Sequence, residues 1–92
     1  MFFEWDENKN LKNIKKHSIS FEFAAHVFTD PLRKENYDKK HSSPDENRII
    51  AIGTAANCLL FVSFTEPDDE TIRIISARKA NKKERNYYNG NR

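Results

Sequence analysis

Three apolar segments in the second half of the chain restrict its possible folds most strongly. They are rich in Ile, Val and Phe and are separated by turn-forming residues, which is typical of β-strands. The segments are Arg48–Gly53, Leu59–Thr65 and Thr71–Ala77. The connections between them, 54–57 and 66–70, are short, whereas a parallel crossover needs a dozen or more residues. The sequence therefore predicts neighbouring antiparallel strands.

Two helices are predicted before these strands. Asp6 is a good N-cap for a helix that runs to about Lys16, in which Leu11 and Ile14 form a narrow apolar stripe. Ser20 can cap a second helix over about Phe21–Phe28. Four of its residues recur at helical spacing and form one apolar face: Phe21, Ala24, Ala25 and Phe28.

The remaining elements are short strands over Phe2–Trp5 and about Lys34–Asp38, and a C-terminal helix over about Ala80–Tyr88. The three main strands are apolar on both faces, so both faces need cover. The predicted fold class is α+β: two N-terminal helices and a C-terminal helix packed on a small antiparallel sheet. The expected order is β-α-α-β-β-β-β-α in one domain, residues 1–92.

Composition favours a reducing compartment. Cys58 is the only cysteine and lies in an apolar run, so we interpret it as a small buried hydrophobic residue. No apolar run approaches the roughly 18 residues of a membrane span, and the N-terminus does not resemble a secretory signal. We expect a cytoplasmic protein with no membrane partner.

Charge is distributed unevenly along the chain. Residues 1–72 carry nine Lys or Arg against thirteen Asp or Glu, a net charge of −4, whereas residues 73–92 carry seven against one, a net charge of +6. The basic C-terminal segment indicates either a polyanionic partner or a solvated basic helix and tail. His17, His26 and His41 lack zinc-type spacing, and no phosphate-binding glycine loop is present, so no metal or cofactor is expected.

The stretch Arg73–Ala80 carries the clearest chemical signal. A buried-type strand ends here in Ser and Arg and leads directly into the basic helix. By strand periodicity Ser76 and Arg78 share a face and Arg73 points the other way. If the helix begins at Arg78, then Arg78, Lys82 and Arg85 share one helical face, and guanidinium groups match phosphate oxygens well.

Two further side chains leave alternatives open. Glu84 is either a structural partner of an arginine such as Arg48 or a proton-transfer group. His17, next to Lys16, is either an acid–base group or a histidine that bonds the carbonyls at a helix end. For His41, in a polar loop, function and plain solvation cannot be separated.

An ordered set of residues resembles the BrnT family of toxins and covers nearly the whole chain. The set comprises Phe3 to Lys9, Asn13, Lys16 to Glu22, Ala25, Val27-Phe28, Asp30-Pro31, Asp38, His41-Ser42, Glu46, Arg48, Ile52-Gly53, Leu60, Val62, Thr65, Arg73 to Ala80, Glu84-Arg85 and Tyr88. Two positions depart from the family pattern. Ser18 stands where the family usually has the glycine of a left-handed helix cap, and Glu66 stands where it often has an arginine.

The resemblance implies a fold similar to RelE-type ribonucleases and metal-independent cleavage of RNA. It also implies a hetero-oligomer with a BrnA-like ribbon-helix-helix antitoxin, through which DNA is bound only indirectly. For cleavage we predict His17, Arg48, Arg73 and Arg78 as catalytic residues. For RNA binding we predict Lys16, Ser76, Lys79, Lys82 and Arg85. The alternatives are a non-enzymatic nucleic-acid binder and an antitoxin-interaction module that uses the basic C-terminal helix.

Overall fold

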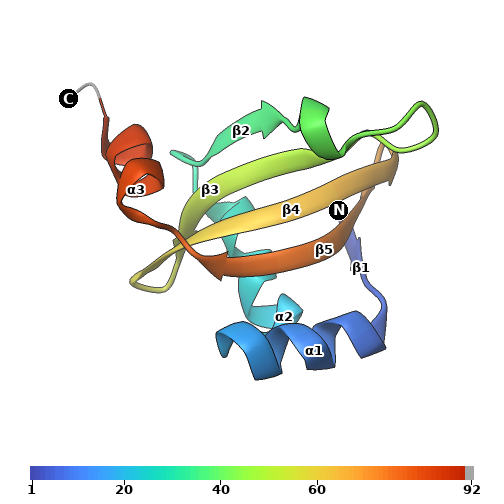
Figure 1. Ribbon diagram of the computed structural model, residues 1–92, viewed down its shortest axis with the longest axis horizontal. Helices are drawn as coiled ribbons and strands as arrows, with labels where there is room; N and C mark the ends of the chain where they lie inside the picture. Colours follow the sequence, from blue (N-terminus) through green and yellow to red (C-terminus); the bar gives the residue numbers. More distant parts are fainter. Residues whose placement is uncertain (91–92) are drawn as a thin grey trace.

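The computed structural model describes residues 1–90 as a five-stranded sheet with helices at one face and one end (Figure 1). The strands are β1 (Phe2–Glu4), β2 (Lys34–Tyr37), β3 (Ile49–Ala55), β4 (Cys58–Asp68) and β5 (Thr71–Lys79). The helices are α1 (Glu7–His17), α2 (Phe21–Ala24) and α3 (Lys82–Asn89), with 3-10 helices η1 (Ala25–Thr29) and η2 (Lys39–His41). Residues 91–92, the end of the basic segment, lie outside the described residues. Within residues 1–90 no helix is long and apolar enough to cross a membrane.

The strand order β1-β5-β4-β3-β2 confirms the α+β class and corrects one detail. Strands β3, β4 and β5 are antiparallel neighbours, as predicted from their short connections, and β2 pairs antiparallel with β3. Strand β1, however, pairs parallel with β5, from Phe2 opposite Thr71 to Glu4 opposite Arg73, so the sheet is mixed. No tight turn sets the direction of β1, because its partner lies at the other end of the sequence. Its direction instead delivers the chain into α1, which packs on β5.

The predicted helix over Phe21–Phe28 forms in two parts. A four-residue α-helix continues into the 3-10 helix η1. A 3-10 helix has three residues per turn, and the fully buried residues Phe21, Ala24 and Val27 follow this spacing, while Ala25 is only half-buried. The aromatic core forms here, where the Phe28 ring meets Phe64 of β4 edge-on at a centroid distance of 4.9 Å.

Helix α1 docks on the sheet through polar side chains. Asn10 and Asn13 are buried, whereas Leu11 of the apolar stripe is 58% exposed. The Nδ2 of Asn13 donates to the carbonyls of Ile19 and Ala77, both at 2.8 Å, and its Oδ1 accepts from the Ala77 N–H at 3.1 Å. Asn10 Oδ1 accepts from the Phe21 N–H at 2.8 Å. The helix is therefore oriented by the backbone groups that it satisfies rather than by its apolar stripe.

The end of α1 keeps the left-handed conformation expected of the family's glycine. Ser18 has φ 59° and ψ 28°, and its N–H donates to the Ile14 carbonyl at 2.8 Å. A non-glycine residue adopts this conformation at some energetic cost. The Ser18 substitution therefore leaves the cap geometry unchanged.

Helix α3 is fastened across the end of the sheet by the buried carboxylate of Asp30. Tyr88 Oη donates to Asp30 Oδ2 at 2.5 Å, and the same oxygen accepts from the N–H and Oγ1 of Thr54, at 2.9 and 3.1 Å. Burial raises the pKa of Asp30, but the hydrogen bonds from Tyr88, Thr54 and Leu32 outweigh it and bring the pKa below its ordinary value. The contact requires Gly53, since a Cβ there would lie 2.9 Å from Val27 Cγ1 and 3.2 Å from Asp30 Oδ2.

Because α1 docks through polar side chains, we predict that a polar residue of this helix contributes more to stability than a residue of its apolar stripe. Replacing Asn13 by alanine leaves both backbone groups of Ala77 without their buried partner and should lower the free energy of unfolding by about 2–4 kcal/mol. Leu11→Ala, on the same helix, should change it by less than about 0.5 kcal/mol. Urea denaturation of the two variants measures both values. A larger loss for Leu11→Ala would contradict the polar docking.

Candidate functional site

A bulge in β5 brings the predicted site residues of this strand onto one face. Ser63 pairs with Ser76, but the next residue, Phe64, pairs with Ile74, so Ile75 is an extra residue in β5. Ile74 and Ala77 consequently both point into the core. Arg73 therefore lies on the same face as Ser76 and Arg78, and the prediction that it points the other way is wrong. Strict alternation fails because a bulge shifts the side-chain phase by one residue.

This face, opposite α2 and η1, is called the open face, and it is hollowed along its length. One hollow of about 310 Å³, here called the arginine groove, is lined by Asp38, His41, Arg48, Ile50, Phe61, Ser63, Ser76 and Arg78. A second, of about 500 Å³, adjoins it through Arg48 and also contains Lys9, Arg73 and three carboxylates. Within residues 1–90 no group of three His, Cys, Asp or Glu side chains has a metal-binding arrangement.

Arg78 is the most firmly held cation of the arginine groove. Its Nη1 and Nη2 donate to the two carboxylate oxygens of Glu84, both at 2.8 Å, and Nη1 also donates to the Lys79 carbonyl at 3.2 Å. Its guanidinium lies 4.0 Å from the centroid of the Phe61 ring. The hydrogen bonds to Glu84 raise the pKa of Arg78 further and lower that of Glu84.

These contacts leave Arg78 able to bind a ligand. A guanidinium has five N–H donors, and within residues 1–90 three of them meet protein acceptors. The remaining donors, on Nε and Nη2, can meet an anion in the arginine groove. Glu84 is thus the structural partner of Arg78, and the suggestion that it pairs with Arg48 is wrong, because α3 places it beside the end of β5.

Arg48 and Arg73 are held more loosely by carboxylates. Arg48 Nε donates to Glu46 Oε1 at 3.0 Å, and Arg73 Nε donates to Glu4 Oε2 at 2.5 Å. All four side chains are a third to a half exposed. Exposed ion pairs contribute about 0–1 kcal/mol, so a phosphate group can replace either carboxylate at little cost.

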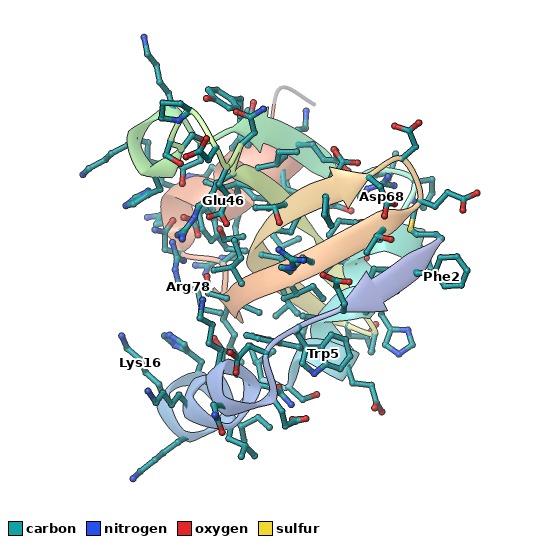
Figure 2. All side chains as sticks on the ribbon, turned by 90° about the vertical axis from the view of Figure 1, so that its right-hand side faces the viewer. Phe2, Trp5, Lys16, Glu46, Asp68 and Arg78 are labelled. Carbon is teal, nitrogen blue, oxygen red and sulfur yellow. The ribbon has the colours of Figure 1, made fainter. Side chains whose placement is uncertain are left out.

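The balance of charge changes along the open face. The lining of the arginine groove contains Arg48 and Arg78 against the single carboxylate of Asp38, and each arginine also pairs with a carboxylate outside this lining, Glu46 or Glu84. A third hollow shares Arg73 with the second one. It contains three carboxylates, those of Asp45, Glu46 and Glu66, and Arg73 is the one arginine in its lining (Figure 2 labels Glu46 and Arg78). The lining of the open face is therefore least acidic at the end that holds Arg48 and Arg78.

The structure brings only part of the predicted site together. Arg48, Ser76 and Arg78 line the arginine groove, and Arg73 lies in the adjoining hollow. The condition for a shared helical face of Arg78, Lys82 and Arg85, a helix that begins at Arg78, is not met, because Asn81 caps α3 and the helix begins at Lys82. Strand β5 continues for two residues beyond its last buried position, Ala77, and α3 then lies within two residues of the predicted range Ala80–Tyr88.

The other predicted residues lie outside the arginine groove. His17 is the last residue of α1, and Arg85 Nη1 donates to the Ala80 carbonyl at 2.9 Å. Lys79 and Lys82 are exposed near the start of α3. Lys16 is exposed on α1 and projects to the same side of the molecule as Arg78 (Figure 2).

Sequence reasoning missed one pair in the arginine groove. The imidazole Nδ1 of His41 lies 2.8 Å from Asp38 Oδ2. The spacing of three residues between an aspartate and a histidine in one polar loop was the available signal. It was not decisive, because only the tertiary structure places this loop beside Arg48 and Arg78.

Together, the mixed sheet and the groove on its open face define a small α+β protein that presents two arginines in a surface hollow. Comparison with known protein families shows to which family this protein belongs. The family model described as "Ribonuclease toxin, BrnT, of type II toxin-antitoxin system" matches residues 5–84. The chain therefore belongs to the BrnT family of ribonuclease toxins, as its sequence resemblance predicted.

A solved structure agrees with this assignment. The chain is similar to the Brucella abortus ribonuclease toxin BrnT, known from a crystal structure at 1.1 Å resolution, with a TM-score of 0.69 and 26% sequence identity. The alignment covers 89% of this chain and all of that one. No curated protein sequence matches the chain.

The ion pair between Arg78 and Glu84 predicts a pH effect on stability. Because the pKa of Glu84 is lowered from its ordinary value of 4.5, first by the hydrogen bond from Arg78, the charged pair stabilises the fold above that pH. The stabilisation is lost as pH falls through the lowered pKa. The free energy of unfolding should therefore fall less steeply below about pH 5 in Glu84→Gln than in the parent. Urea denaturation at a series of pH values tests this, and equal slopes would contradict it.

Proposed function

We propose that the chain is a metal-independent endoribonuclease toxin that a BrnA-like ribbon-helix-helix antitoxin neutralises in a hetero-oligomer. Membership of the BrnT family supports an RNA target and an antitoxin partner. The observation that carries the proposal is the meeting of Arg48, Ser76 and Arg78 in one groove, whose lining holds two arginines and one carboxylate. A RelE-like relationship of the fold and a cytoplasmic location accord with this proposal, and DNA is contacted only through the antitoxin.

The proposed reaction is attack of an RNA 2′-oxygen on the adjacent phosphorus, with departure of the 5′-oxygen. Negative charge builds up on the non-bridging phosphate oxygens, and fixed cations beside them lower the barrier. Arg78 suits this task because Glu84 and Phe61 hold its guanidinium in place before the substrate arrives. Arg48 is the second stabilising cation. Ser76 and Arg73 bind the flanking backbone, with Lys16 extending the path along α1.

A second candidate is an antitoxin-interaction or nucleic-acid-binding module without catalysis. Helix α3 supports it, because Lys82, Lys83 and Arg85 are exposed there, outside the arginine groove. A binder of this kind would leave RNA intact, and its affinity would fall steeply as salt rises. The two candidates are therefore separated by incubating a labelled RNA with the purified protein in the presence of EDTA.

Arg78→Ala tests the role of the arginine groove. The variant should cleave RNA about 100-fold more slowly, by analogy with loss of one oxyanion donor. Arg33→Ala is the matched control, since Arg33 is also paired with a carboxylate, Glu35, but lies outside the groove. It should cleave at the parent rate. Single-turnover cleavage in EDTA measures both, with circular dichroism to verify folding. Cleavage by Arg78→Ala at the parent rate would refute the assignment.

Replacement of Glu66 is predicted to strengthen RNA binding rather than to impair function. It lines the acidic hollow beside Arg73, where the family often has an arginine. Glu66→Arg should therefore tighten RNA binding several-fold and steepen its dependence on salt, because one more cation meets a phosphate. Glu22→Arg makes the same charge change on the exposed surface of α2, away from these hollows. Equal gains in the two variants, measured by fluorescence anisotropy, would mean that only net charge matters.

A further inference from the structure

The pair formed by Asp38 and His41 is the one acid–base arrangement in the arginine groove. His41 Nδ1 lies 2.8 Å from Asp38 Oδ2, and the backbone N–H of His41 donates to the other oxygen, Oδ1, at 3.3 Å. The His41 side chain is 59% exposed, whereas that of Asp38 is 14% exposed. The carboxylate is thus mostly covered by protein, and the imidazole is open to a ligand.

The loop that carries this pair is tied to the start of β3. Ser42 Oγ donates to the Asp38 carbonyl at 2.7 Å and accepts from the Arg48 N–H at 2.8 Å. The Asp38 N–H in turn donates to the Arg48 carbonyl at 2.8 Å. These bonds fix the position of the loop relative to Arg48, so His41 and Arg48 line the groove in a fixed arrangement.

The hydrogen bond to Asp38 decides which imidazole nitrogen is available. An ionised carboxylate only accepts hydrogen bonds, so a neutral His41 carries its hydrogen on Nδ1. Its Nε2 then has a free lone pair, as a general base needs. His17, the histidine favoured from the sequence, does not line the arginine groove.

We infer that His41 is the general base of RNA cleavage and that Asp38 is its positioning residue; this rests on the proposed ribonuclease activity. Nε2 takes the proton of the 2′-hydroxyl as the 2′-oxygen forms its bond to phosphorus. The bond from phosphorus to the 5′-oxygen breaks, and that oxygen takes a proton from water. The products are a 2′,3′-cyclic phosphate and a 5′-hydroxyl end, and the imidazolium then releases its proton to solvent.

The test measures cleavage and binding separately in the full-length chain. Single-turnover cleavage is followed in EDTA with a labelled RNA that contains every dinucleotide step. Affinity is measured with the 2′-O-methyl form of the same RNA, which has no nucleophile. His41→Gln should cleave at least 100-fold more slowly and bind within about threefold of the parent, and added imidazole should restore part of the rate to His41→Ala. His26→Gln, an exposed histidine outside the groove, is the control and should match the parent.

Asp38→Asn tests the positioning role. Asparagine keeps an acceptor for the His41 N–H but can place an amide N–H against Nδ1, which moves the ring hydrogen to Nε2. Cleavage should fall about 10- to 100-fold, with affinity for the 2′-O-methyl RNA unchanged. A parallel loss of affinity would show that Asp38 only shapes the groove and would overturn its assignment.

The remaining outcomes separate this inference from the proposed function. If His41→Gln cleaves at the parent rate while Arg78→Ala loses activity, His41 is not the base and the ribonuclease proposal stands. If His17→Gln loses cleavage and His41→Gln does not, the base is His17. If the parent leaves every RNA intact, the proposed function fails and the role of His41 fails with it.

Discussion

The side chain of Asn13 is the contact on which the geometry of this protein depends. It satisfies both backbone groups of Ala77, the residue of β5 that lies between Ser76 and Arg78. A polar group that is buried without a partner costs about 1–3 kcal/mol, so α1 has one favourable position on the strand. The same contact holds the segment of β5 beyond the bulge at Ile75, from which Ser76 and Arg78 point to the open face.

A second polar junction positions the partner of the key arginine. Asp30 joins η1, β3 and α3 through Thr54 and Tyr88. Because α3 is fixed at Tyr88 and begins at its capping residue Asn81, Glu84 in its first turn is held against Arg78. Packing at one end of the sheet therefore orients the guanidinium that the proposed chemistry uses.

The local arrangement of charged side chains matters more for this surface than the net charge of the C-terminal segment. Arg73 and Arg78 each have a carboxylate partner, so the excess of basic residues in the C-terminal segment does not by itself form a bare cationic surface, and Arg48 is paired as well. What distinguishes the arginine groove is that two arginines and one carboxylate line it and that Arg78, although paired with Glu84, retains unused donors. Ligand selectivity accordingly depends on which carboxylates a phosphate can displace.

The amino-acid sequence alone determined the antiparallel pairing of β3, β4 and β5, since their short connections permit little else. It also determined the family, since an ordered set of family residues recurs along the chain. It also indicated Arg48, Ser76 and Arg78. Only the tertiary structure decided that Arg73 joins their face, because a bulge depends on the register of two strands, and that Glu84 pairs with Arg78. The placing of His41 opposite these arginines was likewise decided by a loop folded onto β3. Such contacts join residues far apart in the chain, and no local periodicity specifies them.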